Sequence, residues 1–235
     1  MRKYFTKEIH SLVNQEELSK IDMIIFDFDG TLHDGKKLSL PIFHDCLQSL
    51  YEEFQIKEEY PSDEIILSQF GKQADDIYPS LLKTTNPQII STFEKCVEEA
   101  EVKAFKEGKG DLYPNVETTL LALRKRGYIL AICTNARTDY FEAAAEYFSL
   151  TNYFDEMMAA GQYPGKDKTW MVSKLIEKLK PNYFAVVGDR YHDIQAARSN
   201  GGIAIGCEYG FGKREVETAD IRITHFDELL TIFYR

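Results

Sequence analysis

Short apolar runs alternate with helical segments over much of this 235-residue sequence, and this alternation constrains the fold more than any other feature. The nearly continuous apolar runs lie at residues 21–26, 128–133, 157–160, 183–187 and 203–205. Such a run is typical of a strand that is covered on both faces, as in a parallel sheet. Segments of helical length and periodicity lie at residues 116–126, 138–149, 167–180 and 191–200. The alternation predicts an α/β fold with a doubly wound, mostly parallel sheet.

Residues 36–109 interrupt this alternation with one helical pattern after another and contain no convincing strand. The expected helices cover residues 39–57, 62–70, 74–83 and 87–107. Gly108 and Gly110 follow them and mark the expected hinge back to the sheet. We therefore predict an N-terminal helix or arm at 1–20, an α/β core at 21–34 and 112–235, and an inserted all-helical cap domain at 35–111.

Charge and hydropathy argue against several classes of partner. The formal net charge of −10 at pH 7 would repel nucleic acid and anionic membrane surfaces, so neither is expected. No stretch approaches the ~20 apolar residues of a membrane span, and the N-terminus lacks the apolar run of a secretory signal. The cysteines form no CxxC pair, so we expect free thiols in the cytoplasm. These cysteines are Cys46, Cys96, Cys133 and Cys207.

The residues that carry chemistry begin directly after the first apolar run, with Asp27-Phe28-Asp29-Gly30. Ligands of an open α/β sheet gather at the carboxyl ends of its strands, and residues two apart in an extended chain point the same way. Asp27 and Asp29 are therefore expected to converge, and two such carboxylates repel each other unless a cation or a proton lies between them. Mg²⁺ is the usual hard cation beside phosphates. Gly30 lets the backbone turn and approach a ligand closely.

The string that begins at Asp27 resembles the first signature of the haloacid dehalogenase superfamily, and the later signatures of that family follow in order. In this family the first aspartate is a nucleophile that becomes phosphorylated and the second is a general acid and base. The resemblance implies these roles for Asp27 and Asp29. Thr134 and Asn135 stand where the family has a hydroxyl and backbone N–H groups that hold the phosphoryl oxygens. The resemblance to this family also implies a Rossmann-like core.

The family further has a lysine near the start of a later helix and a GDxxxD element, here at residues 188–193. Two lysines fit, and the alignment that we prefer selects Lys168, whereas a commoner family pattern selects Lys166. The lysine is expected to offset the negative charge of the nucleophile and the phosphoryl oxygens. Asp193 is expected to orient it or to hold the waters of the metal. The implied Mg²⁺ ligands are Asp27, Asp29 and Asp189, and the implied further phosphate-binding residues are Gly30, Asn135 and Lys166.

The resemblance implies a magnesium-dependent phosphatase that hydrolyses a small phosphorylated metabolite through an aspartyl-phosphate. Phosphoglycolate, a sugar phosphate, a nucleotide and pyrophosphate remain open as substrates, and the cap is similar in position and helicity to that of the phosphoglycolate-phosphatase-like branch. Two alternatives also remain open: a phosphomutase of the β-phosphoglucomutase type, and a non-catalytic regulatory protein on the same scaffold. His33, His192 and Trp170 are interpreted as packing or surface residues.

Overall fold

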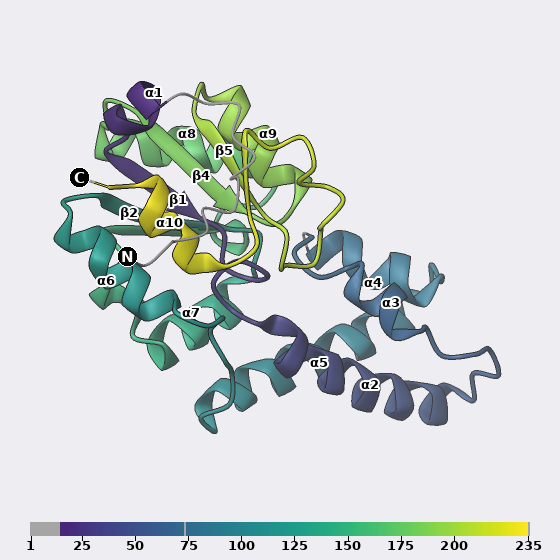
Figure 1. Ribbon diagram of the computed structural model, residues 1–235. Coiled ribbons are helices and arrows are strands. Elements are labelled where there is room, and N and C mark those ends of the chain that lie inside the picture. Colours follow the sequence, from purple (N-terminus) through teal and green to yellow (C-terminus); the bar gives the residue numbers. More distant parts are fainter. Residues whose placement is uncertain (1–14, 73, 235) are drawn as a thin grey trace, which may run out of the picture.

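The computed structural model describes residues 15–72 and 74–234, and the strands in this part of the chain form one parallel sheet (Figure 1). The strands are β1 Met23–Phe26, β2 Ile129–Thr134, β3 Glu156–Ala159, β4 Phe184–Gly188, β5 Ile203–Cys207 and β6 Ile221–Ile223. Their order is β3-β2-β1-β4-β5-β6, and every neighbouring pair is parallel. This order confirms the predicted doubly wound α/β sheet, and its direction of winding reverses between β1 and β4.

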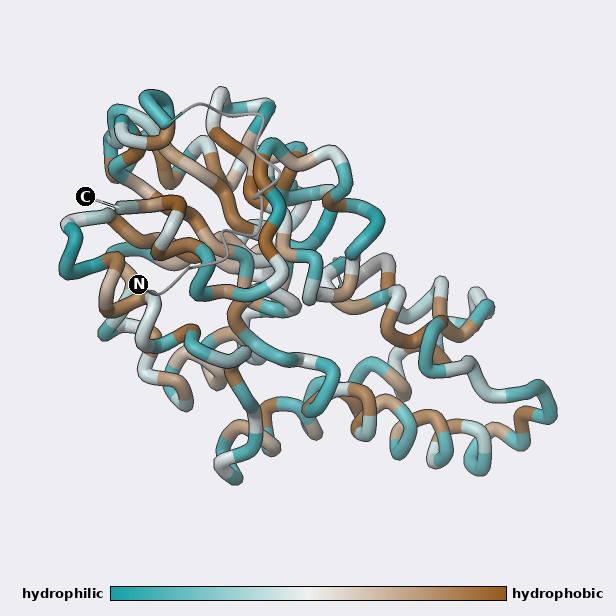
Figure 2. The backbone as a smooth tube through the Cα atoms, viewed as in Figure 1, coloured by the Kyte–Doolittle hydropathy of each residue, from teal (hydrophilic) through white to brown (hydrophobic). Residues whose placement is uncertain are grey.

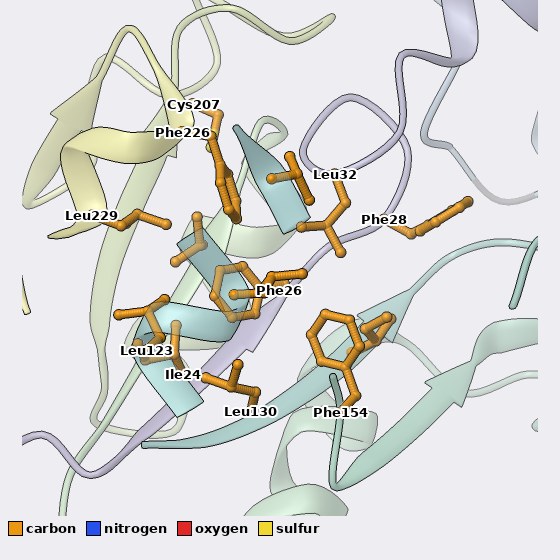
Figure 3. Close-up of a cluster of buried hydrophobic side chains, with 14 of the residues drawn as sticks. Ile24, Phe26, Phe28, Leu32, Leu123, Leu130, Phe154, Cys207, Phe226 and Leu229 are labelled. Atoms are coloured by element: carbon orange, nitrogen blue, oxygen red, sulfur yellow. The ribbon is translucent and has the colours of Figure 1, made fainter. Parts of the chain in front are cut away.

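Helices cover both faces of the sheet, so the side chains of β1 alternate between two hydrophobic cores. Ile24 and Phe26 lie in the core beneath α6 Val116–Lys125 and α7 Thr138–Tyr147, part of which is drawn in Figure 3. Met23 and Ile25 lie in the opposite core, beneath α8 Lys168–Leu179 and α9 Tyr191–Ser199. The brown, hydrophobic stretches in Figure 2 accordingly run through the strands. Burial on both faces explains why the strand sequences are continuously apolar.

Short elements complete the sheet domain. They are the helices α1 Gln15–Lys20 and α10 Leu229–Ile232 and the 3-10 turns η1 Leu150–Asn152, η2 Ala160–Gln162 and η3 Phe226–Glu228. The rest of the predicted arm at 1–20 lies outside the described residues. The sequence did not indicate β6, because three residues with an arginine at the centre carry no readable strand pattern. No helix in the described ranges is long and apolar enough to cross a membrane.

The inserted segment forms a separate helical lobe beside the sheet domain (Figure 1). Its helices are α2 Gly35–Phe54, α3 Asp63–Leu67, α4 Ala74–Leu82 and α5 Pro87–Lys106, close to the predicted ranges. Phe43, Leu47 and Phe93 are among the side chains that give this lobe its own hydrophobic core. Two segments connect this lobe to the sheet domain, and they are hydrogen-bonded to each other: N–H of Asp34 donates to the backbone oxygen of Asp111 at 2.8 Å.

The cysteines correct one prediction. Cys46 of α2 and Cys96 of α5 form a disulfide, so only Cys133 and Cys207 are free thiols. The pairing was not readable from the sequence because 50 residues separate the two cysteines, and only the packing of α2 against α5 brings their Cα atoms to 5.8 Å. The bond therefore fastens together the two longest helices of the cap.

Candidate active site

The predicted site residues gather where the strands end, at the reversal of winding. Asp27 directly follows β1, Thr134 ends β2, and Asp189 directly follows β4. Because β1 lies between β2 and β4, these three positions are neighbours along one edge of the sheet. This edge is where open α/β sheets bind their ligands.

Lys168 enters the site from the first turn of α8. The carboxylate of Asp167 accepts a hydrogen bond from N–H of Trp170 at 2.8 Å and caps the helix there. The buried Nζ of Lys168 lies 2.9 Å from Oδ1 of Asp27 and 2.7 Å from Oδ1 of Asp193. Lys166 is exposed instead, with its Nζ 5.4 Å from the centre of the Trp170 ring. The structure thus brings Lys168, and not Lys166, to Asp27.

Three buried carboxylates form a group that could hold a metal ion. Ligand atoms of Asp27, Asp189 and Asp193 all lie within 4.8 Å of one another. Lys168 is in direct contact with Asp27 and Asp193, whereas Arg190 pairs with Glu215 and acts on Asp189 through its charge. A buried set of oxygen ligands fits a hard divalent cation such as Mg²⁺. Two of the predicted ligands, Asp27 and Asp189, are in this group together with Asp193, and the role of Asp29 as a ligand stays a prediction.

The acid–base properties of this group have the same origin. Burial raises the pKa of Asp27 well above its ordinary value, and the charges of Asp193 and Asp189 add to the effect while Lys168 opposes it. Burial likewise raises the pKa of Asp189 to about 7, with Asp193 as the next cause. Burial alone would lower the pKa of Lys168, but the carboxylates of Asp193 and Asp27 raise it, so the ammonium group stays charged. Burial and repulsion between neighbouring carboxylates thus act in the same direction on Asp27 and Asp189.

Glycine and backbone N–H groups hold Asp189 in place. Gly30 has a φ of +81°, and a Cβ on it would lie 2.5 Å from Oδ2 of Asp189. That oxygen accepts hydrogen bonds from N–H of Phe211 at 2.7 Å and of Gly212 at 3.3 Å. The predicted role of Gly30 was the close approach of a ligand, and the structure adds that Gly30 leaves room for the Asp189 carboxylate.

Asp29 is not part of the acidic group, and two aromatic side chains hold its carboxylate. Its Oδ1 lies 2.8 Å from Nδ1 of His33 and accepts a hydrogen bond from the hydroxyl of Tyr140 at 2.7 Å. His33 is completely buried, so it is a packing residue as interpreted but also a polar partner of Asp29. One signal in the sequence could have indicated this contact: His33 lies four residues after Asp29 and directly follows the apolar Leu32.

Thr134 is the last residue of β2 and Asn135 follows it, and the two side chains make different contacts. Oγ1 of Thr134 accepts a hydrogen bond from N–H of Ala136 at 3.2 Å, which leaves its own O–H to donate elsewhere. Nδ2 of Asn135 donates to the backbone oxygen of Gly71 in the cap at 3.1 Å. Asn135 therefore joins the core to the cap in this structure.

A cavity between the core and the cap reaches Asp27, Asp29, Thr134 and Asn135, and its volume is about 70 Å³. Arg137 also lines it and is held by two glutamates of α5, with N–O distances of 2.9 Å to Glu98 and 3.1 Å to Glu101. Nothing in the sequence indicated this contact, because the partners are more than thirty residues apart and belong to different domains.

Comparison with known proteins agrees with this arrangement. The family described as haloacid dehalogenase-like hydrolase matches residues 24–206. A phosphoglycolate phosphatase of Mannheimia succiniciproducens is 30% identical over 82% of this chain and 88% of its own length. One of Pasteurella multocida is 29% identical over 83% and 88%.

Solved structures share the fold over both domains. The crystal structure of a predicted phosphoglycolate phosphatase from Haemophilus somnus covers 91% of this chain and 98% of its own, with a TM-score of 0.79 and 24% identity. That of CbbY from Rhodobacter sphaeroides, in complex with phosphate, has a TM-score of 0.72 and 19% identity over 89% of this chain and 96% of its own. The chain therefore belongs to the haloacid dehalogenase-like hydrolase family, in the branch that resembles the phosphoglycolate phosphatases.

Proposed function

We propose that this chain hydrolyses a small phosphate monoester through a phosphorylated Asp27. The observation that carries the proposal is the state of the Asp27 carboxylate. Its Oδ1 is engaged by N–H of Phe28 at 2.8 Å and by Lys168 at 2.9 Å, whereas no hydrogen bond reaches Oδ2 from the residues that the structure describes. One oxygen is thus fixed and the other is free to attack phosphorus at the wall of the cavity.

The residues around Asp27 supply the remaining roles. Lys168 and the Thr134 hydroxyl offset the negative charge of the phosphoryl oxygens. Asp29 donates a proton to the leaving oxygen as the P–O bond breaks, and it then takes a proton from the water that attacks the aspartyl-phosphate. Asp27, Asp189 and Asp193 would hold Mg²⁺, which when bound neutralises carboxylate charge and lets an anionic substrate approach an anionic nucleophile.

The cavity favours a small leaving group. Its volume of about 70 Å³ is well below the roughly 300–1,000 Å³ of sites that take drug-sized ligands. Phe43 and Phe70 of the cap and Phe211 of the core narrow it with apolar walls. The phosphoglycolate phosphatases among the relatives are named for a small substrate. We propose phosphoglycolate, or an ester of similar size, ahead of a sugar phosphate or a nucleotide.

A phosphate-release screen tests the proposal. Purified protein is incubated with phosphoglycolate, sugar phosphates, nucleotides and pyrophosphate, each with Mg²⁺ and with EDTA. We expect release from the smallest esters, loss of it in EDTA, recovery with added Mg²⁺, and no activity in Asp27→Asn. Asp45→Asn is the matched control, because Asp45 is exposed on the cap and should leave the rate unchanged.

Three outcomes would contradict the proposal. Interconversion of sugar phosphates without free phosphate would make the protein a phosphomutase. Turnover of no ester or anhydride would favour a regulatory protein on the same scaffold. Equal rates in EDTA and in Mg²⁺ would remove the metal from the mechanism.

A further inference from the structure

Asp29, the general acid of the proposed reaction, is held by hydrogen bonds to one of its two carboxylate oxygens. Oδ1 of Asp29 accepts the hydroxyl proton of Tyr140 at 2.7 Å and lies 2.8 Å from Nδ1 of His33. The Tyr140 hydroxyl is also 3.2 Å from the same Nδ1, so the three groups form a closed triangle. No hydrogen bond reaches Oδ2 of Asp29 from the described residues, although Asp29 lines the cavity.

The His33 ring has little freedom to leave this position. It is completely buried, stacks on Phe28 with ring centres 5.2 Å apart, and has Phe105 and Phe148 at 5.5 and 5.6 Å. Its Nε2 has no hydrogen-bond partner in the described part of the chain. An N–H at Nε2 would have no acceptor there, so the tautomer with its hydrogen on Nδ1 is favoured, and it donates to Asp29.

The hydroxyl of Tyr140 is the second hydrogen-bond donor to Oδ1 of Asp29. Its ring is buried, with 5% of its surface exposed. Burial raises the pKa of Tyr140 well above its ordinary value, and the negative charge of Asp29 adds to the effect. The hydroxyl therefore keeps its proton near neutral pH. Both partners of Oδ1 donate hydrogen bonds, so a proton on that oxygen would displace one of them.

We propose that His33 and Tyr140 are positioning residues that hold Oδ1 of Asp29 as an acceptor, so that Oδ2 alone carries the proton to and from the reacting oxygens. This inference rests on the proposed function, in which Asp29 is the general acid and base. In the first step Oδ2–H protonates the leaving oxygen while Asp27 bonds to phosphorus. In the second step the attacking water returns a proton to Oδ2 as the aspartyl-phosphate breaks.

A pair of substrates of similar size separates positioning from general damage. Phosphoglycolate leaves as an alkoxide and needs a proton, whereas acetyl phosphate leaves as acetate and needs none. A correctly placed general acid contributes ~10²–10⁴-fold to such a rate, and misplacing a group can cost ~10²-fold. We expect Tyr140→Phe and His33→Leu to lower kcat/KM ~10–100-fold for phosphoglycolate, and by less than ~3-fold for acetyl phosphate.

Two further variants sharpen the test. His33→Asn places an amide N–H near the position of Nδ1–H, and it should recover most of the phosphoglycolate rate that His33→Leu loses. Tyr147→Phe is the matched control, because Tyr147 lies on the same helix, is partly exposed, and donates its hydroxyl to the backbone oxygen of Gly108. It should change neither rate.

The possible results are distinguishable. If wild-type protein is active but Tyr140→Phe and His33→Leu lower both rates equally, or lower neither, the positioning role is refuted and the proposed function stands. Failure of His33→Asn to exceed His33→Leu would also refute it. If wild-type protein releases phosphate from neither ester nor from any other phosphate ester in the screen, the proposed function fails and this inference fails with it.

Discussion

Replacing Lys168 by methionine should damage both the stability and the chemistry of the site. The side chain is 3% exposed and contacts two buried carboxylates, at 2.9 Å for Asp27 and 2.7 Å for Asp193. Methionine has a similar length but no charge, so the carboxylates lose their cation. Removing one partner of a buried ion pair typically costs ~3–5 kcal/mol. For a chain of this size each kcal/mol lowers the thermal midpoint by about 2–4 °C, so we expect a fall of at least ~6 °C.

The assay is thermal unfolding at pH 8 in EDTA, followed by circular dichroism, together with phosphate release in Mg²⁺. Lys166→Met is the matched control: its charge is exposed and its contact with Trp170 is of the cation–π type, so a loss below ~1 kcal/mol is expected. A Lys168→Met variant that keeps its activity and a midpoint within ~2 °C of the wild type would contradict this role of Lys168, as would an equal loss of either in Lys166→Met.

Three other predictions follow from single contacts. In the folded protein the pKa of Asp189 is raised to about 7 from 3.8, so its contribution to stability is present below pH ~4 and is lost as pH rises through about 7. The thermal midpoint of the metal-free protein should therefore fall over this pH range. The fall should be smaller in Asp189→Asn. Gly30 and Gly127 have positive φ values of 81° and 82°, so Gly30→Ala and Gly127→Ala should both lower the stability. Only Gly30→Ala should also lose phosphate release, because its Cβ would lie 2.5 Å from Oδ2 of Asp189. Thiol titration of unfolded protein should find two thiols before reduction and four after it; four before reduction would contradict the Cys46–Cys96 bond.

The features that the sequence predicted are local patterns with a direct physical cause. Strands buried on both faces must be continuously apolar, so β1, β2 and β4 were readable as runs. The order of the signatures after those runs then located Asp27 and Asp189 at neighbouring strand ends. The inserted helices were readable because the helical period replaces the strand pattern over residues 36–109.

The features that it missed are contacts between distant segments. The disulfide joins α2 to α5 across 50 residues, and Arg137 meets Glu101 only because the cap folds onto the core. The spacing of Asp29 to Asp27 did not show that its Oδ1 accepts a hydrogen bond from Tyr140, a residue 111 positions later. Spacing fixes which edge of the sheet a residue occupies, whereas the orientation of its side chain depends on partners from elsewhere in the chain.

The most direct test of the account is to locate the covalent intermediate. Enzyme turning over phosphoglycolate, or the best ester of the screen, is quenched in acid within milliseconds and its peptides are examined by mass spectrometry. We predict one phosphoryl group on the peptide that contains Asp27, none on it in Asp27→Asn, and none when EDTA replaces Mg²⁺. An active enzyme that carries no phosphoryl group at any time of quenching, or carries it on another residue, would contradict the central claim.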